Sequence, residues 1–185
     1  IVATGVGASA DRGGSVVVQP DSKIVLAGYA YDGSDDLDWD FALVRYNTNG
    51  TLDSTFSGDG KVTSEVGPRG AAHGGVGEPS VALQSDGKIV VAGVAWNGTN
   101  TDFAVARYNA NGSLDTTFGG DGVVTTSIGT HNDVARSVAM QADGKILVAG
   151  SAYIGINDAF ALVRYNPNGT LDTSFDGDGR LITEF

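Results

Sequence analysis

The chain lacks cysteine and is poor in several residue types that mark particular classes of protein. Without cysteine it can form neither a disulfide framework nor a thiolate metal site. Only 4 prolines stand beside 28 glycines, a combination that favours tight turns between short strands over disorder. The longest apolar run, residues 89–96, is too short to span a bilayer. No charged-then-apolar leader precedes Ile1, so we expect that any signal peptide has been removed or was never part of this sequence.

Positive charge is also scarce, with 11 Lys and Arg against 22 Asp and Glu and a net charge of -11. Such a surface repels phosphate backbones and anionic lipid, which argues against nucleic-acid binding and membrane insertion. A divalent cation or a basic partner suits it better. The same charge also simply keeps a glycine-rich β protein soluble.

Signatures of catalysis are few. The only histidines are His73 and His131, without metal-ligand spacing, and the chain has no G-x-S-x-G elbow and no phosphate-binding loop. Carboxylates are abundant, so a hydrolase remains an alternative. Because most of the acids recur identically along the chain, they indicate scaffold more than an active site.

The chain instead consists of one sequence unit repeated three times. The block "FALVRYNTNGTLDSTFSGDG" begins at Phe41, and close copies of it begin at Phe103 and Phe160. Spacing inside the block is constant, so the length differences lie in other loops, chiefly residues 67–80. We interpret the chain as one domain, residues 1–185, with units over 8–66, 67–128 and 129–185.

Each unit contains four strand-like runs, which in the first unit are residues 15–19, 23–31, 40–47 and 61–66. A turn of the "SDGK" type predicts a hairpin between the first two, although Ser22 replaces its glycine in the first unit. The second and third runs are apolar on both faces and must be covered on both. The sequence therefore predicts an all-β, β-propeller-like array of four-stranded repeats.

Ala-Gly pairs inside the second run indicate that another backbone approaches the sheet closely at that point. They are residues 27–28, 92–93 and 149–150.

The beginning of the chain adds a strand to this count. Residues 1–7 align with residues 123–129, so we expect them to be the last strand of a preceding unit. Three units are then either an excerpt from a longer array or half of a six-bladed ring made by two chains, in which the extra strand completes a neighbour's blade. The alternative is a closed pseudo-threefold trefoil or prism, which has no use for a thirteenth strand.

The motifs "RYNxNGxLDxxFxGDG" and "QxDGKIxVAG" together resemble the delta-60 repeat, a bacterial repeat with a β-propeller-like fold. The resemblance covers essentially the whole chain; minor departures are Ser22 in the turn and Ala159 where Asp40 and Asp102 stand in the other units. It implies an extracellular or cell-surface array in a bacterial protein, and it brings no catalytic residues with it.

One arginine in each unit shares a strand face with apolar residues, so its stem is expected to be buried and its charge to need a partner. The arginines are Arg45, Arg107 and Arg164, and the acids considered as partners are Asp53 or Asp59, with their counterparts Asp115, Asp121, Asp172 and Asp178. We expect these ion pairs to be structural.

The most acidic stretch is residues 32–40, which has no equally charged counterpart in the other units. It is the candidate cation site, with Ca²⁺ the suggested ion and a solvated loop the alternative. Its carboxylates are those of Asp32, Asp35, Asp36, Asp38 and Asp40.

Aromatic residues in the same set of loops are candidate ligand contacts, on which sugar rings or a protein partner could stack. They are Tyr31, Trp39, Trp96 and Tyr153, and burial between blades is the alternative for each. From the sequence we expect a secreted or cell-surface binding module for carbohydrate or protein that needs no cofactor and self-associates. The alternatives are a hydrolase of polysaccharides or esters that uses the acids of residues 32–40, and a structural spacer of a bacterial adhesin.

Overall fold

The computed structural model describes residues 1–8, 10–31, 33, 39–67 and 77–184, and these residues contain twelve strands. The strands are β1 (Asp11–Val18), β2 (Ile24–Tyr31), β3 (Trp39–Tyr46), β4 (Lys61–Ser64), β5 (Ser80–Leu83), β6 (Ile89–Trp96), β7 (Thr101–Tyr108), β8 (Val123–Thr126), β9 (Asp133–Met140), β10 (Ile146–Tyr153), β11 (Asp158–Tyr165) and β12 (Arg180–Thr183). The described part of the chain contains no helix with the length and apolarity needed to cross a membrane.

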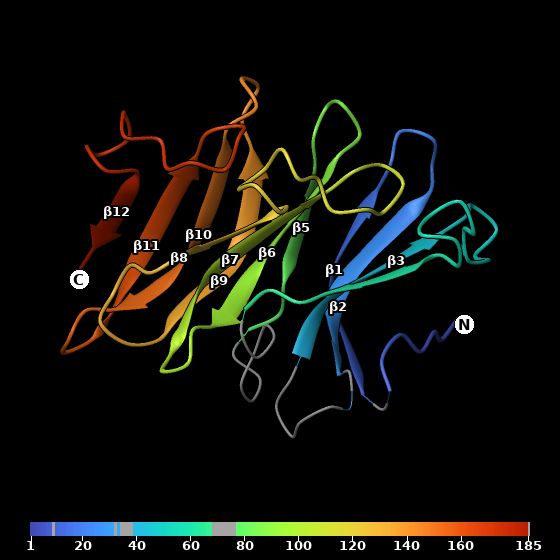
Figure 1. Ribbon diagram of the computed structural model, residues 1–185, viewed down its shortest axis with the longest axis horizontal. Coiled ribbons are helices and arrows are strands. Elements are labelled where there is room, and N and C mark those ends of the chain that lie inside the picture. Colours follow the sequence, from blue (N-terminus) through green and yellow to red (C-terminus); the bar gives the residue numbers. More distant parts are fainter. Residues whose placement is uncertain (9, 32, 34–38, 68–76, 185) are drawn as a thin grey trace.

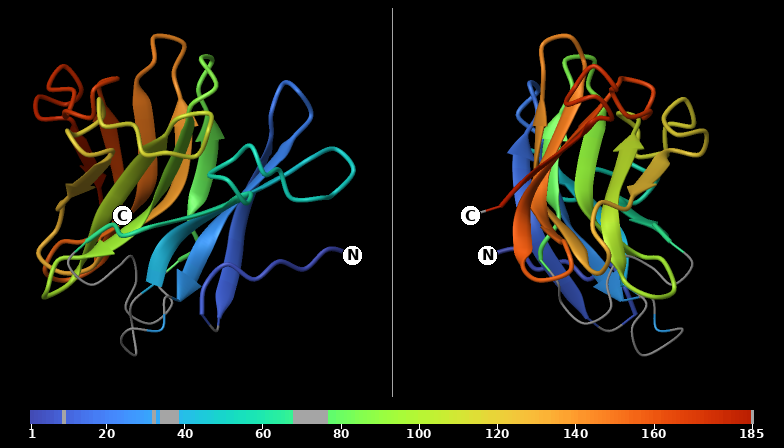
Figure 2. Two further views of the ribbon diagram at one scale, coloured as in Figure 1. Left: turned by 45° about the vertical axis from the view of Figure 1, so that its right-hand side comes forward. Right: turned by 90° about the vertical axis from the view of Figure 1, so that its left-hand side faces the viewer.

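Strands consecutive in sequence pair antiparallel to form three sheets of four strands. The sheets β1–β4, β5–β8 and β9–β12 are called the first, second and third blade. They lie side by side in an open row, with the second blade in the middle and the outward faces of the other two at opposite ends (Figures 1 and 2). The predicted all-β, β-propeller-like architecture is confirmed. The row is not a closed ring, and the trefoil or prism alternative is wrong because the outward faces of the first and third sheets do not pack on each other: Val16 and Phe160 on these faces are 58% and 66% exposed.

Turn chemistry sets the register of the inner hairpins. In the second blade the turn is closed by the amide of Gln84 donating to the carbonyl of Lys88 at 2.9 Å, and Gly87 adopts a φ of 86°. The corresponding position of the first blade is Ser22, which is held at a φ of 66°. A side chain disfavours this left-handed conformation, so the first blade carries local strain there.

The core lies between blades. One cluster joins Val25 and Leu43 of the first blade to Val91 of the second, and another joins Val105 of the second to Val148 of the third. Both faces of the middle sheet are therefore covered, as its two-sided apolar strands require. Each fully buried large side chain contributes about 1.5–3 kcal/mol relative to an exposed one.

The glycine in the middle of each second strand is required by close packing. A Cβ on Gly28 would lie 2.0 Å from the carbonyl oxygen of Arg12, and one on Gly150 would lie 1.9 Å from that of Val134. These are the backbone approaches predicted from the Ala-Gly pairs. At Gly93 the near neighbour is a side chain of the preceding blade, because Phe41 Cε1 lies 2.7 Å from the Cβ position.

Residues 1–7 do not form the predicted strand, since they have no strand partner among the described residues. They nevertheless lie where the last strand of a preceding blade belongs. The hydroxyl of Tyr46 donates to Thr4 Oγ1 at 2.8 Å, just as Tyr165 donates to Thr126 of the blade before it. The segment lacks strand structure because no strand among the described residues pairs with it. The third blade already has its own fourth strand, β12, paired with β11.

Candidate functional site

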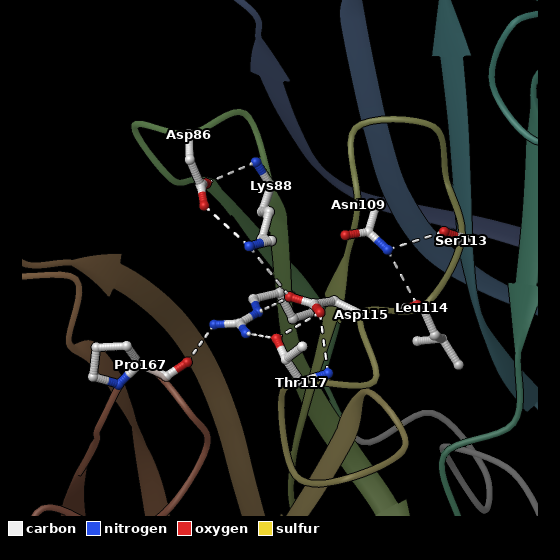
Figure 3. A network of polar contacts seen from close by, with 9 residues as sticks. Asp86, Lys88, Asn109, Ser113, Leu114, Asp115, Thr117 and Pro167 are labelled. Carbon is white, nitrogen blue, oxygen red and sulfur yellow. Dashed lines mark hydrogen bonds and ion pairs between the residues drawn. The ribbon is translucent and has the colours of Figure 1, made fainter.

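The most regular polar cluster is an ion-pair network repeated in every blade. In the second blade Arg107 Nε lies 2.7 Å from Asp115 Oδ2, and Lys88 Nζ lies 3.5 Å from the same oxygen (Figure 3). The other carboxylate oxygen accepts from the amide and hydroxyl of Thr117, at 3.1 and 2.7 Å. The first and third blades repeat the arrangement with Arg45–Asp53–Lys23 and Arg164–Asp172–Lys145.

Two acids were considered as partners for each arginine, and each guanidinium pairs with the first of them, which is Asp53, Asp115 or Asp172. The second acid caps a turn instead: Asp59 accepts from the amide of Lys61, and Asp121 and Asp178 have the same position in the other blades. A phenylalanine lies under each guanidinium, with the arginine Cζ 4.6–4.8 Å from the ring centroid in a cation–π contact. The rings are those of Phe56, Phe118 and Phe175.

The network also joins neighbouring blades. Arg45 Nη1 donates to the carbonyl of Ala110 in the second blade at 2.6 Å, and Arg107 Nη1 makes the equivalent contact to the carbonyl of Pro167 in the third. Figure 3 shows Pro167 at the left of the network, joined to the guanidinium by a dashed line. The guanidinium therefore links its own turn to the turn of the next blade.

The network lowers the pKa of its carboxyl groups. Burial is the largest single effect on Asp53 and Asp115 and acts to raise the pKa. It is outweighed by hydrogen bonds from Thr55 or Thr117 and by the neighbouring cations, so both pKa values lie below the usual range. For Asp172 the largest effect is the hydrogen bond from Ser174, and its pKa is lowered too.

These carboxylates are structural. A carboxylate offers about four acceptor sites. Asp115 accepts hydrogen bonds from Arg107 and from both donors of Thr117, and Lys88 lies 3.5 Å away as an ion-pair partner. The carboxylate is thus engaged within the network.

The asparagine-rich turn that follows the third strand of each blade is satisfied internally as well. The amide of Gly50 donates to the carbonyl of Asn47 at 2.9 Å, and the amide of Thr51 donates to Asn49 Oδ1 at 3.0 Å. Gly50 has a φ of 82°. The pattern is that of a tight turn closed by its own asparagines.

The four candidate aromatic residues lie at one end of the blades, where the second strands end and the third begin. Tyr31 and Trp39 pair across the first blade with ring centroids 5.9 Å apart, and the guanidinium of Arg12 lies 4.7 Å from the Trp39 ring centroid. Trp96 and Tyr153 end the corresponding strands of the other blades. All four side chains are half-buried, so each has part of its surface available.

Among the acidic-loop candidates only Asp40 lies within the described residues, at the start of β3, where it is half-buried. Asp32, Asp35, Asp36 and Asp38 lie outside them. Within the described ranges, no three His, Cys, Asp or Glu side chains come close enough together to hold a metal ion.

A cleft in the third blade brings one of the aromatic candidates together with polar side chains. It has a volume of about 340 Å³, and Tyr153, His131, Asp158, Arg136 and Ser151 contribute to its wall. Asn132 and Val134 complete the lining. The rings of His131 and Tyr153 pack edge to face, with centroids 5.0 Å apart and planes at 74°. The cleft thus offers an aromatic ring, a carboxylate and a guanidinium to a small polar ligand.

A buried carboxylate supports this region. Asp133 is fully buried and accepts from the amides of Ile128 and Gly129, at 2.7 and 3.0 Å. Burial raises the pKa of Asp133, and the nearby carboxylate of Asp102 raises it further. Asp102 itself accepts from Asn97 Nδ2 at 2.9 Å. Asp133 therefore holds the loop that carries His131 and Asn132.

Sequence reasoning missed the lysines of the network, the cleft and the buried Asp133. A lysine four residues after the Gln of each "QxDGK"-type turn is a usable signal, since it recurs with the Arg-Asp pair. The cleft had no signal because residues 131–136 and 151–158 meet only in the folded blade.

The fold and the repeated network together define a β-propeller repeat protein with three blades. The three repeats match the family described as a domain of unknown function (DUF5122) beta-propeller, over residues 19–56, 84–118 and 141–175. These segments make up more than half of the 185 residues, so the chain belongs to this family. Each match includes the lysine, arginine, aspartate and phenylalanine of one network, whereas His131 and Arg136 of the cleft lie outside the matches. A comparison with curated proteins found no match.

Proposed function

We propose that this β-propeller module binds a carbohydrate in the cleft of the third blade. The observation that carries the proposal is the meeting of Tyr153, Asp158 and Arg136 in a recess of about 340 Å³. Sugars are bound through an aromatic surface together with polar side chains that fix their hydroxyl groups, and small-molecule sites begin at about 300 Å³. The recess suits one or two sugar rings better than the broad contact of a protein partner.

The test is a glycan array followed by calorimetry with the glycan retained. Asp158→Asn should raise the dissociation constant at least about 10-fold, because the exposed carboxylate would no longer accept two hydroxyl donors with full charge. Asp176→Asn is the matched control, since it makes the same charge change in an exposed turn beyond the other end of β11. Absence of any retained glycan, or equal loss in both variants, contradicts the proposal.

Two further outcomes of the same experiment separate the alternatives. Turnover of a retained glycan would favour the hydrolase, and binding without turnover favours the module. A chain that retains no glycan and no protein behaves as the structural spacer of an adhesin.

We also propose that the module works outside the cell or on a bacterial cell surface. The resemblance to the delta-60 repeat supports this, together with the acidic net charge of -11 and the absence of cysteine. Fractionation of the source cell with an antibody to the module tests it, and recovery in the cytoplasm contradicts it.

Calcium binding by residues 32–40 stays a prediction from the sequence. Titration of Ca²⁺ into the native chain, followed by calorimetry, should give heat that is lost in Asp35→Asn and Asp36→Asn. Equal heats in all three proteins contradict the prediction.

A further inference from the structure

The outward face of the third blade repeats a surface that is buried in the other two blades. Phe41 and Phe103 are 0% exposed because the next blade covers them, whereas their counterpart Phe160 is 66% exposed. Phe160 lines an apolar groove of about 740 Å³ together with Leu162 and Leu181. We call this surface, formed by β10, β11 and β12, the tail face.

The outward face of the first blade repeats the complementary surface. Val81 and Val138 pack against the preceding blade and are 6% and 9% exposed, whereas their counterpart Val16 is 58% exposed. Val16 lies opposite Leu26 in the sheet, on the side that points away from the core shared with the second blade. We call this surface, formed by β1 and β2, the head face.

Polar groups on the two faces complement each other in the same way. At each internal interface the arginine of one blade donates to a turn carbonyl of the next. A backbone amide donates beside it: Ser57 to the carbonyl of Asn111, and Gly119 to that of Asn168, at 2.8 and 3.0 Å. By position in the repeat, the tail face presents the donors of Arg164 Nη1 and the Asp176 amide. The head face presents the acceptors, which are the carbonyls of Thr48 and Asn49.

We propose that the tail face of one chain binds the head face of a second copy, head to tail. Phe160 then packs against Gly28 of the second copy, as Phe103 packs within 2.9 Å of the Cβ position of Gly150. Two copies joined this way at both ends supply six blades, which is within the four to eight that close a propeller. Every exposed apolar face of the row is covered in such a dimer.

One segment has to move when this contact forms. Residues 1–7 occupy the place of a preceding fourth strand, and in the dimer β12 of the other copy belongs in that place. β12 pairs with β11 over four residues, from Phe160↔Thr183 to Val163↔Arg180, whereas residues 1–7 pair with no strand in the described part of the chain. Because β12 is the better paired of the two, β12 of the other copy takes the position beside the first blade and displaces residues 1–7.

The test is the mass of the full chain in solution, by light scattering and sedimentation. The native chain should have the mass of two chains. Phe160→Asp and Val16→Asp should each raise the dissociation constant at least 10-fold, with unchanged circular dichroism because both side chains are exposed. Ile156→Asp is the matched control, since Ile156 is an exposed apolar residue of the third blade that lies outside the groove. Its dimer should persist.

Mixing the two interface variants tests the direction of the contact. Phe160→Asp has an intact head face and Val16→Asp an intact tail face, so their mixture should recover association through one good interface. Thr4→Val removes the hydrogen bond that holds residues 1–7 to Tyr46 and should tighten the dimer several-fold. A native mass of one chain at every concentration, no recovery on mixing, or no tightening by Thr4→Val overturns the corresponding part of the proposal.

Discussion

Replacing Arg107 by leucine tests whether the repeated network holds the blades together. The substitution keeps an apolar stem but removes the ion pair to Asp115, the hydrogen bond to Thr117 and the contact to the carbonyl of Pro167. It leaves the Asp115 carboxylate 4% exposed, with Lys88 at 3.5 Å as its nearest remaining cation.

The expected loss follows from that geometry. Removing one partner of a buried ion pair costs about 3–5 kcal/mol. The side chain of Lys88 is 30% exposed and can move closer to Asp115, so we take the lower end of this range of free energy. We expect the free energy of unfolding to fall by about 3 kcal/mol. For a domain of this size that loss lowers the melting temperature by about 6–12 °C.

Urea unfolding followed by circular dichroism, with calorimetry alongside, measures the effect at a concentration where the chain is monomeric. Arg164→Leu is the matched control, because Arg164 makes the same ion pair at the exposed end of the row without a following blade. The free energy of unfolding should fall less in Arg164→Leu than in Arg107→Leu. Adding Asp115→Asn to Arg107→Leu should restore part of the stability by removing the stranded charge. A loss below about 1 kcal/mol, or equal losses in both arginine variants, refutes the reasoning.

Three other substitutions or conditions give independent checks. Ser22→Gly should raise the free energy of unfolding by about 0.5–1 kcal/mol, since Ser22 is held at a φ of 66°; an unchanged urea midpoint would contradict the strain. Gly93→Ala should cost about 1–3 kcal/mol because its Cβ would lie 2.6 Å from the Tyr29 hydroxyl, whereas Gly5→Ala, with its nearest atom at 3.8 Å, should be neutral in the same assay. The lowered pKa values of Asp53, Asp115 and Asp172 contribute stability that is present above the unfolded pKa of about 3.8 and is lost as the pH falls through the lower folded values. The raised pKa of Asp133 has the opposite effect on the pH dependence of stability. Asp115→Asn should reduce the slope of the free energy of unfolding against pH on the acid side. An equal slope in that variant and in the native chain would contradict the lowered pKa of Asp115.

Much of the fold could be predicted because the same sequence unit occurs three times in the chain. Repetition of the Phe41 block fixed the number of units, and strands apolar on both faces required a neighbour on each side. The strand predicted over residues 1–7 was wrong for a physical reason. Its residues match a strand, but a strand needs a hydrogen-bonded partner, and no described residue pairs with the segment at that place.

The functional surfaces were less accessible to sequence reasoning. Tyr153 was a candidate from its position after a strand, but its neighbours Arg136 and His131 come from the adjacent strand β9 and the loop before it and share no motif with it. The exposure of Phe160 could not be predicted at all, because its sequence context is the same as that of Phe41. The two differ in packing, since Phe41 is covered by the second blade and is 0% exposed, whereas Phe160 lies on an outward face of the row and is 66% exposed.

The most direct test of the blade-to-blade packing is a nuclear Overhauser spectrum of the assigned native chain. The account predicts cross-peaks from the ring protons of Phe41 to the α-protons of Gly93, and from those of Phe103 to the α-protons of Gly150. The ring carbons lie 2.7 and 2.9 Å from the corresponding Cβ positions, which places the protons well within range. A well-dispersed spectrum without either cross-peak would show that the sheets do not pack face to face through these glycines, and would contradict the account.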